Sequence, residues 1–384
     1  MWSAVGYIQI EVSTLKHFAK ALLAAVTAVT VAAPIPAAPA AAGGKAPVHR
    51  ATRFRGVPTF ANSTLADIGT FDDPIVREAA VEGLGRYNGA VVAVNPNTGR
   101  ILTVVNQKVA FGDGFIPCST IKPTIAVAAL EENVITRDTM LRVHDRRARY
   151  MNLTEALAHS NNDFFEQLGV RMGFDTVSKY ARLMGLGELA GYNLPEEHPG
   201  SFPMAPPVHG GVARMSSFGE GIQITPFQLV SLASAFANGG TLYYLQYPRT
   251  PEDLQNFQPK VKRDLNIAPV LPEIREGMLA AVLYGTAKRS FDAGGDETPL
   301  GKTGTCNDPT SKVGWFVTYA DEQHPKIALA VLLRGQSHQV EGPTAALVAG
   351  RIYKRLREQN YFASSTASND TVKPVTVVST DSGN

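Results

Sequence analysis

A serine and a lysine, spaced by one helical turn, are the first residues of this 384-residue sequence that could perform chemistry. Ser119 stands three residues before Lys122 at the start of an apolar run, so a helix would place both side chains on one face. Burial among apolar residues lowers the pKa of a lysine toward neutrality. A neutral amine can then take the hydroxyl proton and make the serine a nucleophile. The plainer interpretation is that Ser119 caps the helix.

Two further polar motifs follow along the chain. Ser160-Asn161-Asn162 lies in an expected connection into a helix, and Lys302-Thr303-Gly304-Thr305 lies on an expected strand. A cationic lysine beside two hydroxyls suits a carboxylate ligand. A glycine within a strand allows a ligand to lie close to the backbone. Taken singly, the two motifs have structural explanations, as a helix cap and an exposed strand edge.

Hydrophobic patterns predict the elements that must position these motifs. Residues 89–106 contain two β-rich runs around an Asn-Pro-Asn-Thr-Gly turn, and residues 313–334 contain a second such pair, so both segments are predicted hairpins. Residues 225–240 and 344–359 have the spacing of helices. Strands at both ends and helices between them predict an α+β fold, in which the two hairpins share one antiparallel sheet flanked by helices.

The composition narrows the classes of function. Apolar residues make up 44% of the chain, charged residues 18%, and the formal net charge is +2. This balance predicts a globular protein without the broad basic surface that nucleic acid requires. The eight histidines are scattered and there are two cysteines, so neither a metal nor another cofactor is predicted.

The N-terminal region has the pattern of an export signal. Lys16 and Lys20 precede an apolar run over 21–33, which is shorter than the ~20 residues needed to cross a bilayer, and Ala38-Pro39-Ala40 offers a cleavage site. We therefore predict a signal peptide over 1–42, the alternative being an uncleaved anchor that tethers the protein to the membrane. A linker over 43–72, a folded domain over 73–360 and a disordered tail over 361–384 complete the predicted organisation.

The three motifs, in this order and with their wide spacing, resemble those of the serine penicillin-recognising enzymes. The resemblance to the transpeptidase domain of penicillin-binding proteins extends from about Asp73 to Arg357 and includes "CSTIKPTIAVAALEE", "AHSNND", "GEGIQITPFQLVSLASAFANGG" and "GKTGTC". It implies a β-lactamase/transpeptidase-like fold with an inserted all-helical lobe. One departure is Cys118, since that family usually has glycine before the nucleophile.

The resemblance also implies a role for each motif residue. Ser119 would be the acylated nucleophile and Lys122 its base. Ser160 would relay a proton between the two lysines and the leaving group, and Asn162 would hold the substrate backbone and Lys122. The carboxylate of the substrate or of a β-lactam would bind to Lys302, Thr303 and Thr305, which flank Gly304. The backbone N–H groups of Ser119 and Thr305 would form the oxyanion hole.

The resemblance finally bears on the two cysteines. In the family's fold the strand of the lysine motif runs beside the start of the nucleophile helix, and some class A carbapenemases have bonded cysteines at these two offsets. It thus implies a Cys118–Cys306 disulfide, which an exported protein would retain. The alternative is a pair of free, buried thiols.

The function implied is that of a peptidoglycan D,D-transpeptidase or D,D-carboxypeptidase that acts through an acyl-enzyme. Its partners would be peptidoglycan stem peptides and β-lactams, with no nucleic acid, and its place the periplasm or cell envelope. A serine β-lactamase and a β-lactam sensor or structural cell-wall protein without turnover remain as alternatives. Against the β-lactamase, we find no acidic loop of the class A kind, and the class D pattern would have valine at Asn162.

Overall fold

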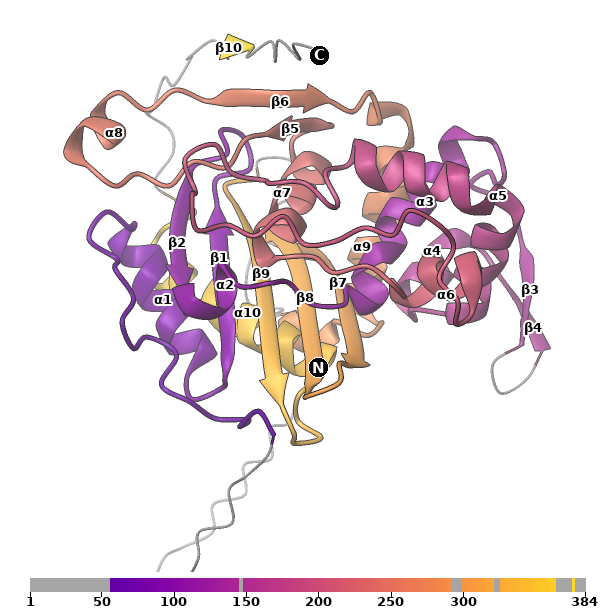
Figure 1. The fold of residues 1–384 in the computed structure, drawn as a ribbon, viewed down its shortest axis with the longest axis horizontal. Coiled ribbons are helices and arrows are strands. Elements are labelled where there is room, and N and C mark those ends of the chain that lie inside the picture. The colour runs from indigo at the N-terminus through magenta and orange to yellow at the C-terminus, as the bar shows by residue number, and fades with distance from the viewer. Residues whose placement is uncertain (1–55, 145–147, 292–297, 321–324, 364–374, 377–384) are drawn as a thin grey trace, which may run out of the picture. The chain divides into compact units, whose positions relative to one another are not determined.

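A five-stranded antiparallel sheet forms the centre of the computed structural model, which describes residues 56–144, 148–291, 298–320, 325–363 and 375–376. Its strands are β1 Gly89–Val94, β2 Ile101–Val105, β7 Pro299–Asn307, β8 Lys312–Ala320 and β9 Ile327–Gly335. They run in the order β2-β1-β9-β8-β7 (Figure 1). Because β1 pairs with β9, with Val91 opposite Val331, the first and last hairpins share one sheet, as predicted.

The two faces of the sheet pack into separate cores. Along β1, Val91 and Ala93 face one core while Val92 and Val94 face the other, which is the two-residue period of a strand. The first core is closed by α1 Pro74–Leu84 and α10 Gly342–Glu358. The second is closed by α3 Lys122–Glu131, α7 Pro226–Ala237 and most of α9 Leu271–Leu283. Since both faces are covered, the strands are apolar on both sides.

A lobe made mainly of helices lies on the β7 side of the sheet (Figure 1). It contains α3 and the elements η1 Cys118–Ile121, β3 Leu141–His144, β4 Ala148–Met151, α4 Leu153–Ala158, α5 Asn162–Leu183 and α6 Gly211–Phe218. The hairpin β3–β4 differs from the predicted all-helical lobe. It forms because buried Leu141 and Val143 alternate with exposed Arg142 and His144, the pattern of a half-buried strand.

The remaining elements connect the lobe to the sheet. They are α2 Gln107–Ala110, β5 Thr241–Tyr243, α8 Pro251–Gln255, β6 Lys260–Asp264, η2 Ala268–Val270, η3 Lys288–Ser290 and β10 Val375–Thr376, with a small sheet in the order β10-β6-β5. Helix α7 begins at a capping box between Thr225 and Gln228 and ends before Gly239, in agreement with its pattern.

The segment before α1 is bound to the domain over the part that the structure describes, residues 56–72. Asp72 accepts hydrogen bonds from Thr103 Oγ1 at 2.6 Å and from the Tyr247 hydroxyl, and it pairs with Arg77 at 2.8 Å. Asp67 accepts from the backbone N–H of Gln107 at 2.8 Å. The folded domain therefore begins before Asp73, unlike the predicted linker. The polar composition of this segment predicted a linker. The partners of Asp67 and Asp72 lie far along the chain, so no local pattern shows that these acids are bound.

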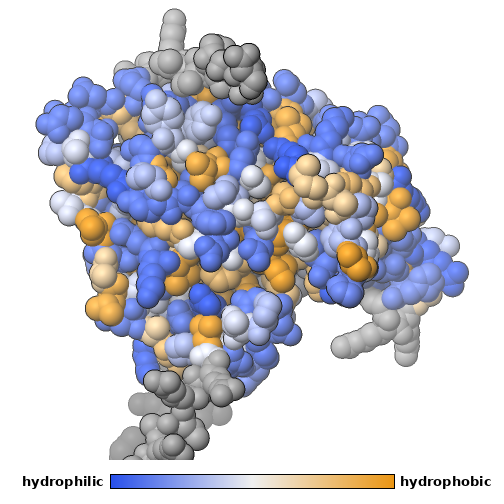
Figure 2. All heavy atoms as spheres, viewed as in Figure 1, coloured by the Kyte–Doolittle hydropathy of each residue, from blue (hydrophilic) through white to orange (hydrophobic). Residues whose placement is uncertain are grey.

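The predicted export signal lies outside the described residues, and so does most of the predicted tail. Within the part of the chain that the structure describes, no helix combines the length and apolar character needed to cross a bilayer. On the face shown in Figure 2, hydrophobic residues are scattered among hydrophilic ones.

Candidate active site

Ser119 lies in the turn of 3₁₀-helix η1, which leads directly into α3. Its side chain does not cap the helix: neither η1 nor α3 has a side-chain cap, and the Ser119 hydroxyl instead accepts a hydrogen bond from Lys122 Nζ at 3.0 Å. The serine is 8% exposed. The preceding residue, Cys118, has a φ of 52°, a left-handed conformation that is unusual for a side chain other than glycine.

Lys122 is fully buried and is surrounded by oxygen atoms of the first two motifs. Besides Ser119, its Nζ donates to the backbone oxygen of Ser160 at 2.7 Å, to Ser160 Oγ at 3.1 Å and to Asn162 Oδ1 at 2.7 Å. Burial lowers the pKa of Lys122 well below its ordinary value, and the cation of Lys302 lowers it further. A lysine held in this way loses its proton more readily than an exposed lysine does.

The second motif forms the short turn between α4 and α5. Asn161 caps α5 by accepting from the N–H of Phe164 at 2.9 Å. The sequence analysis gave a helix cap as the structural explanation of this motif. Asn161, which lies between Ser160 and Asn162, makes that cap. Ser160 has a φ of 55°, and this left-handed turn leaves its hydroxyl free to face both lysines.

Lys302 reaches the same hydroxyl from strand β7. Its Nζ donates to Ser160 Oγ at 2.8 Å and to the backbone oxygen of Thr303 at 3.0 Å. Burial lowers the pKa of Lys302 to about 7. Ser160 therefore bridges the two buried lysines, and all three motifs meet at one place.

The two threonines of the third motif form hydrogen bonds with residues that the sequence analysis did not identify. Thr303 Oγ1 lies 2.7 Å from Thr286 Oγ1, and Thr305 Oγ1 accepts from the N–H of Gly342 at 2.7 Å. The first residue of α10 thus orients one side of the strand. No local pattern signals such partners, because they come from distant segments.

Gly304 lets β7 approach the start of the nucleophile helix. A Cβ at this position would lie 3.0 Å from the backbone oxygen of Pro117 and 3.2 Å from the Cβ of Cys118. The glycine was predicted to make room for a ligand. In the structure its open side is taken by the residues before Ser119, so it sets the distance between the two halves of the site.

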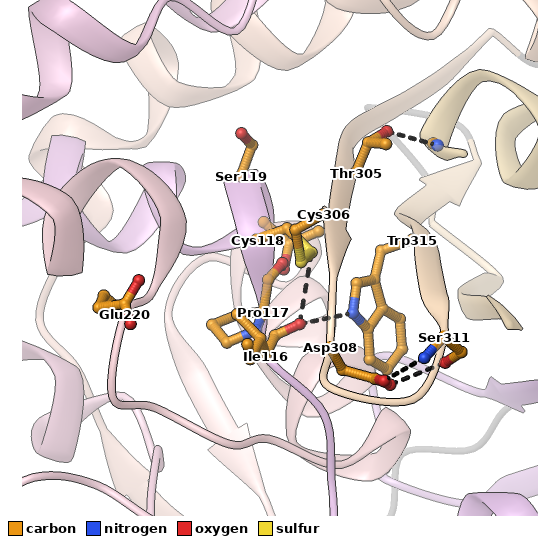
Figure 3. The surroundings of a disulfide bond; sticks show 12 residues. Ile116, Pro117, Cys118, Ser119, Glu220, Thr305, Cys306, Asp308, Ser311 and Trp315 are labelled. Atoms are coloured by element: carbon orange, nitrogen blue, oxygen red, sulfur yellow. Dashed lines mark hydrogen bonds between the residues drawn. A yellow bond between two sulfur atoms is a disulfide. The ribbon is translucent and has the colours of Figure 1, made fainter. Parts of the chain in front are cut away.

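Cys118 and Cys306 are joined between these same two segments, with their Cα atoms 5.7 Å apart. In the view of Figure 3, Ser119 and Thr305 lie on one side of the pair, and Asp308 and Ser311 lie on the other. The indole N–H of Trp315 donates to the backbone oxygen of Ile116 at 3.0 Å and supports the chain just before the cysteine. Covalent and hydrogen-bonded links therefore hold η1 against β7 and β8.

One carboxylate acts on this group of residues without belonging to any motif. Glu166 follows Asn162 by four residues on α5, which places both on one face of the helix. It accepts a hydrogen bond from Ser217 Oγ of α6 at 3.0 Å. Its negative charge raises the pKa of Lys122, in opposition to burial and to Lys302. The spacing from Asn162 was the only sequence signal for it.

Comparison with known proteins places the chain in a family. The profile of the penicillin binding protein transpeptidase domain matches residues 89–354. Stage V sporulation protein D of Bacillus subtilis is 27% identical over 314 residues, which cover 68% of this chain and 48% of that protein. Peptidoglycan D,D-transpeptidase PbpA of Mycobacterium tuberculosis is 26% identical over 351 residues, covering 74% of this chain and 70% of that one. The chain thus spans only about half the length of the Bacillus relative.

Among solved structures, penicillin-binding protein A from M. tuberculosis, as an imipenem acyl-enzyme complex, superposes with a TM-score of 0.61 at 23% identity, over 73% of this chain and 78% of that one. The D,D-transpeptidase domain of a peptidoglycan glycosyltransferase from Eggerthella lenta gives 0.59 at 20% identity, over 75% and 82%. These likenesses show a shared fold. With the domain profile covering most of its length and the three motifs converging, the chain belongs to the penicillin-binding protein transpeptidase domain family.

Proposed function

We propose that this protein is a peptidoglycan D,D-transpeptidase or D,D-carboxypeptidase that works through an acyl-enzyme on Ser119 and is acylated by penicillin. The observation that carries the proposal is the contact between Ser119 Oγ and the buried Lys122 Nζ, at 3.0 Å. The name of one relative, peptidoglycan D,D-transpeptidase PbpA, supports the same chemistry. The substrates would be the D-Ala-D-Ala ends of stem peptides.

In the proposed acylation, Lys122 accepts the hydroxyl proton as Ser119 Oγ attacks the carbonyl carbon of the penultimate D-Ala. The peptide bond to the terminal D-Ala then breaks, and its nitrogen receives a proton through Ser160, which contacts both lysines. Water or an amine acceptor afterwards attacks the ester, and Ser119 regains its proton. The oxyanion would be stabilised by the N–H groups of Ser119 and Thr305.

Lys302, Thr303 and Thr305 would bind the terminal carboxylate. A pKa of about 7 for Lys302 is compatible with this role, since an incoming carboxylate favours the protonated amine. Asn162 would hold Lys122, to which its Oδ1 is already bound at 2.7 Å, and would offer its amide nitrogen to the substrate backbone.

We further propose that the protein acts outside the cytoplasm, in the periplasm or cell envelope. The apparent export signal over 1–42 and the paired Cys118 and Cys306 both favour an oxidising compartment. An uncleaved N-terminal segment would add a membrane tether.

Labelling with a fluorescent penicillin, followed by a peptide assay, tests the proposal. The wild-type chain should form a lasting covalent adduct and release D-Ala from a D-Ala-D-Ala peptide, with or without an amine acceptor. Ser119→Ala should lose the adduct while retaining the wild-type melting temperature. The matched control is Ser63→Ala. It removes a hydroxyl that donates to the backbone oxygen of Tyr87, and neither residue belongs to a motif.

Each alternative has a distinct outcome in this experiment. Rapid release of the penicillin product would identify a β-lactamase. A lasting adduct without action on any D-Ala-D-Ala peptide would identify a sensor or structural protein. Full labelling of Ser119→Ala would contradict the nucleophile assignment itself.

A further inference from the structure

The first turn of α5 carries three side chains that act on Lys122. Asn162, Phe165 and Glu166 share one face of the helix, because the second and third follow the first by three and four residues. Asn162 Oδ1 accepts from Lys122 Nζ at 2.7 Å, and the carboxylate of Glu166 acts on its charge. Phe165 belongs to none of the motifs, yet Lys122 Nζ lies over its ring, 5.5 Å from the ring centre.

This distance is within the range of a cation–π interaction, in which the negative face of an aromatic ring attracts a cation. Such an interaction is strongest where water is excluded, and both Lys122 and Phe165 are fully buried. Phe165 packs beside Phe164, whose ring centre is 5.6 Å away, within the core that α3 closes. The packing of the core therefore holds the ring next to the amine.

The hydrogen bonds of Lys122 suit both its charged and its neutral form. Two of its partners, the backbone oxygen of Ser160 and Asn162 Oδ1, can only accept, and each lies 2.7 Å from Nζ. An ammonium group satisfies both and donates its third hydrogen to a serine hydroxyl. A neutral amine satisfies both with its two hydrogens and accepts from that hydroxyl. The balance between the two forms therefore depends on the groups that respond to charge.

Opposing influences act on the charge of Lys122. Burial and the cation of Lys302, on β7, favour the neutral form, and the carboxylate of Glu166 favours the charged form. The ring of Phe165 acts in the same direction as Glu166. Several charged residues on the helices around α3 have other partners. They are Asp163 with His144, Glu155 with His159, Arg214 with Glu220, and Glu276 with Arg137.

We propose that Phe165 is a positioning residue that holds Lys122 as an ammonium ion in the resting enzyme, through the attraction of its ring face for Nζ. This role rests on the proposed function and makes it more specific, since the first turn of α5 then sets the pH at which Ser119 becomes reactive. Lys122 must lose its proton before it acts as the base, and the ring opposes that loss. Weakening the ring's attraction should lower the pKa of Lys122, so acylation should begin at lower pH.

Fluorination of the ring tests this role with little change in packing. Each fluorine withdraws electrons from the ring face and weakens its attraction for a cation, while the side chain keeps nearly the same shape. The chain is therefore prepared with a monofluorinated or a trifluorinated phenylalanine in place of Phe165. The same replacements of Phe164 are the matched control, because that residue is equally buried but the ring beneath Lys122 Nζ is that of Phe165.

The rate constant of acylation by a fluorescent penicillin, measured between about pH 5 and pH 9, gives the midpoint of the rising limb. Trifluorination of Phe165 should lower this midpoint by roughly half a unit to one unit, and monofluorination by less. Phe165→Leu should move it in the same direction. The chains fluorinated at Phe164 should keep the wild-type midpoint. Carbon NMR of Lys122 Cε follows the same titration without any need for turnover.

A wild-type midpoint in the chains fluorinated at Phe165 would overturn the inference. Equal shifts from Phe164 and Phe165 would also overturn it, because packing would then explain both. Failure of the proposed function looks different: the wild-type chain is then not labelled by penicillin at all. The NMR titration of Lys122 still decides in that case whether the ring holds the ammonium form.

Discussion

Lys122 has the environment that a serine-activating base requires: full burial, contact with the Ser119 hydroxyl, and the nearby charge of Lys302. Replacing it by Ala should slow penicillin acylation by about 10²–10⁴-fold, because the proton acceptor is lost. Lys122→Arg should be equally slow, because a guanidinium does not give up its proton. Stopped-flow acylation rates of folded variants measure this. A Lys122→Arg enzyme that acylates at the wild-type rate would refute the role of base.

The two lysines also define a pH dependence. Lys122 must be neutral to accept a proton, so acylation should rise with pH as Lys122 deprotonates. Lys302 must be charged to hold the carboxylate, so kcat/KM should fall as pH rises through about 7. Glu166 raises the pKa of Lys122, and its removal in Glu166→Gln should therefore move the rising limb to lower pH.

Ser217→Ala is the matched control for that variant, because it removes the hydrogen bond to Glu166 but keeps the charge. Its rising limb should stay close to that of the wild type. An unchanged rising limb in Glu166→Gln would show that the carboxylate does not act on Lys122.

At the scale of elements, the sequence predicted those parts of the fold whose pattern is local. The hairpins β1–β2 and β8–β9 follow from β-rich runs around turns, and α7 follows from the helical spacing of its apolar residues and its glycine stop. The burial of Lys122 could be inferred because apolar residues surround it in the sequence itself.

The undetected features depend on contacts between distant segments. The left-handed turn at Ser160, the support of Thr305 by Gly342 and the binding of Asp72 by Tyr247 each need the tertiary fold. The hairpin β3–β4 was overlooked for another reason: its strands are four residues long and carry few apolar side chains.

The link between η1 and β7 gives a prediction at the same scale. The two cysteines are separated by 188 residues, and closing so long a loop contributes about 5 kcal/mol in the chain-entropy model. Reductant should therefore lower the urea midpoint of the wild-type chain substantially. The double variant Cys118→Ser, Cys306→Ser should show the lower midpoint without reductant and no further response to it.

Intact-mass measurement after alkylation checks the premise of that prediction. Two alkylated thiols in the unreduced, denatured protein would mean that the bond is not formed. In that event the wild-type chain and the double variant should have the same midpoint with and without reductant.

At the scale of the whole molecule, residues 56–72, the described segment before α1, belong to the folded unit. Removing everything before Asp73 deletes Asp72 and leaves the Tyr247 hydroxyl and the Arg77 guanidinium without this partner. Each unsatisfied buried group costs about 1–3 kcal/mol, so a chain that begins at Asp73 should melt several degrees below one that begins at Gly56. Calorimetry compares the two. If the two chains have the same melting temperature, residues 56–72 act as a linker, as the sequence predicted.

The pairing of β1 with β9 has a consequence for biosynthesis. Val91 finds its partner only when Val331 has been made, and at 5–20 residues per second this takes roughly 10–50 s. During that interval the first hairpin has one open edge, and sheets with such distant pairings fold slowly. A ribosome-bound chain that ends before β9 therefore lacks the central strand of its sheet, although it already carries Ser119, Lys122, Ser160 and Lys302. Reactivity toward penicillin should consequently arise late, in a single step, as translation passes the last hairpin.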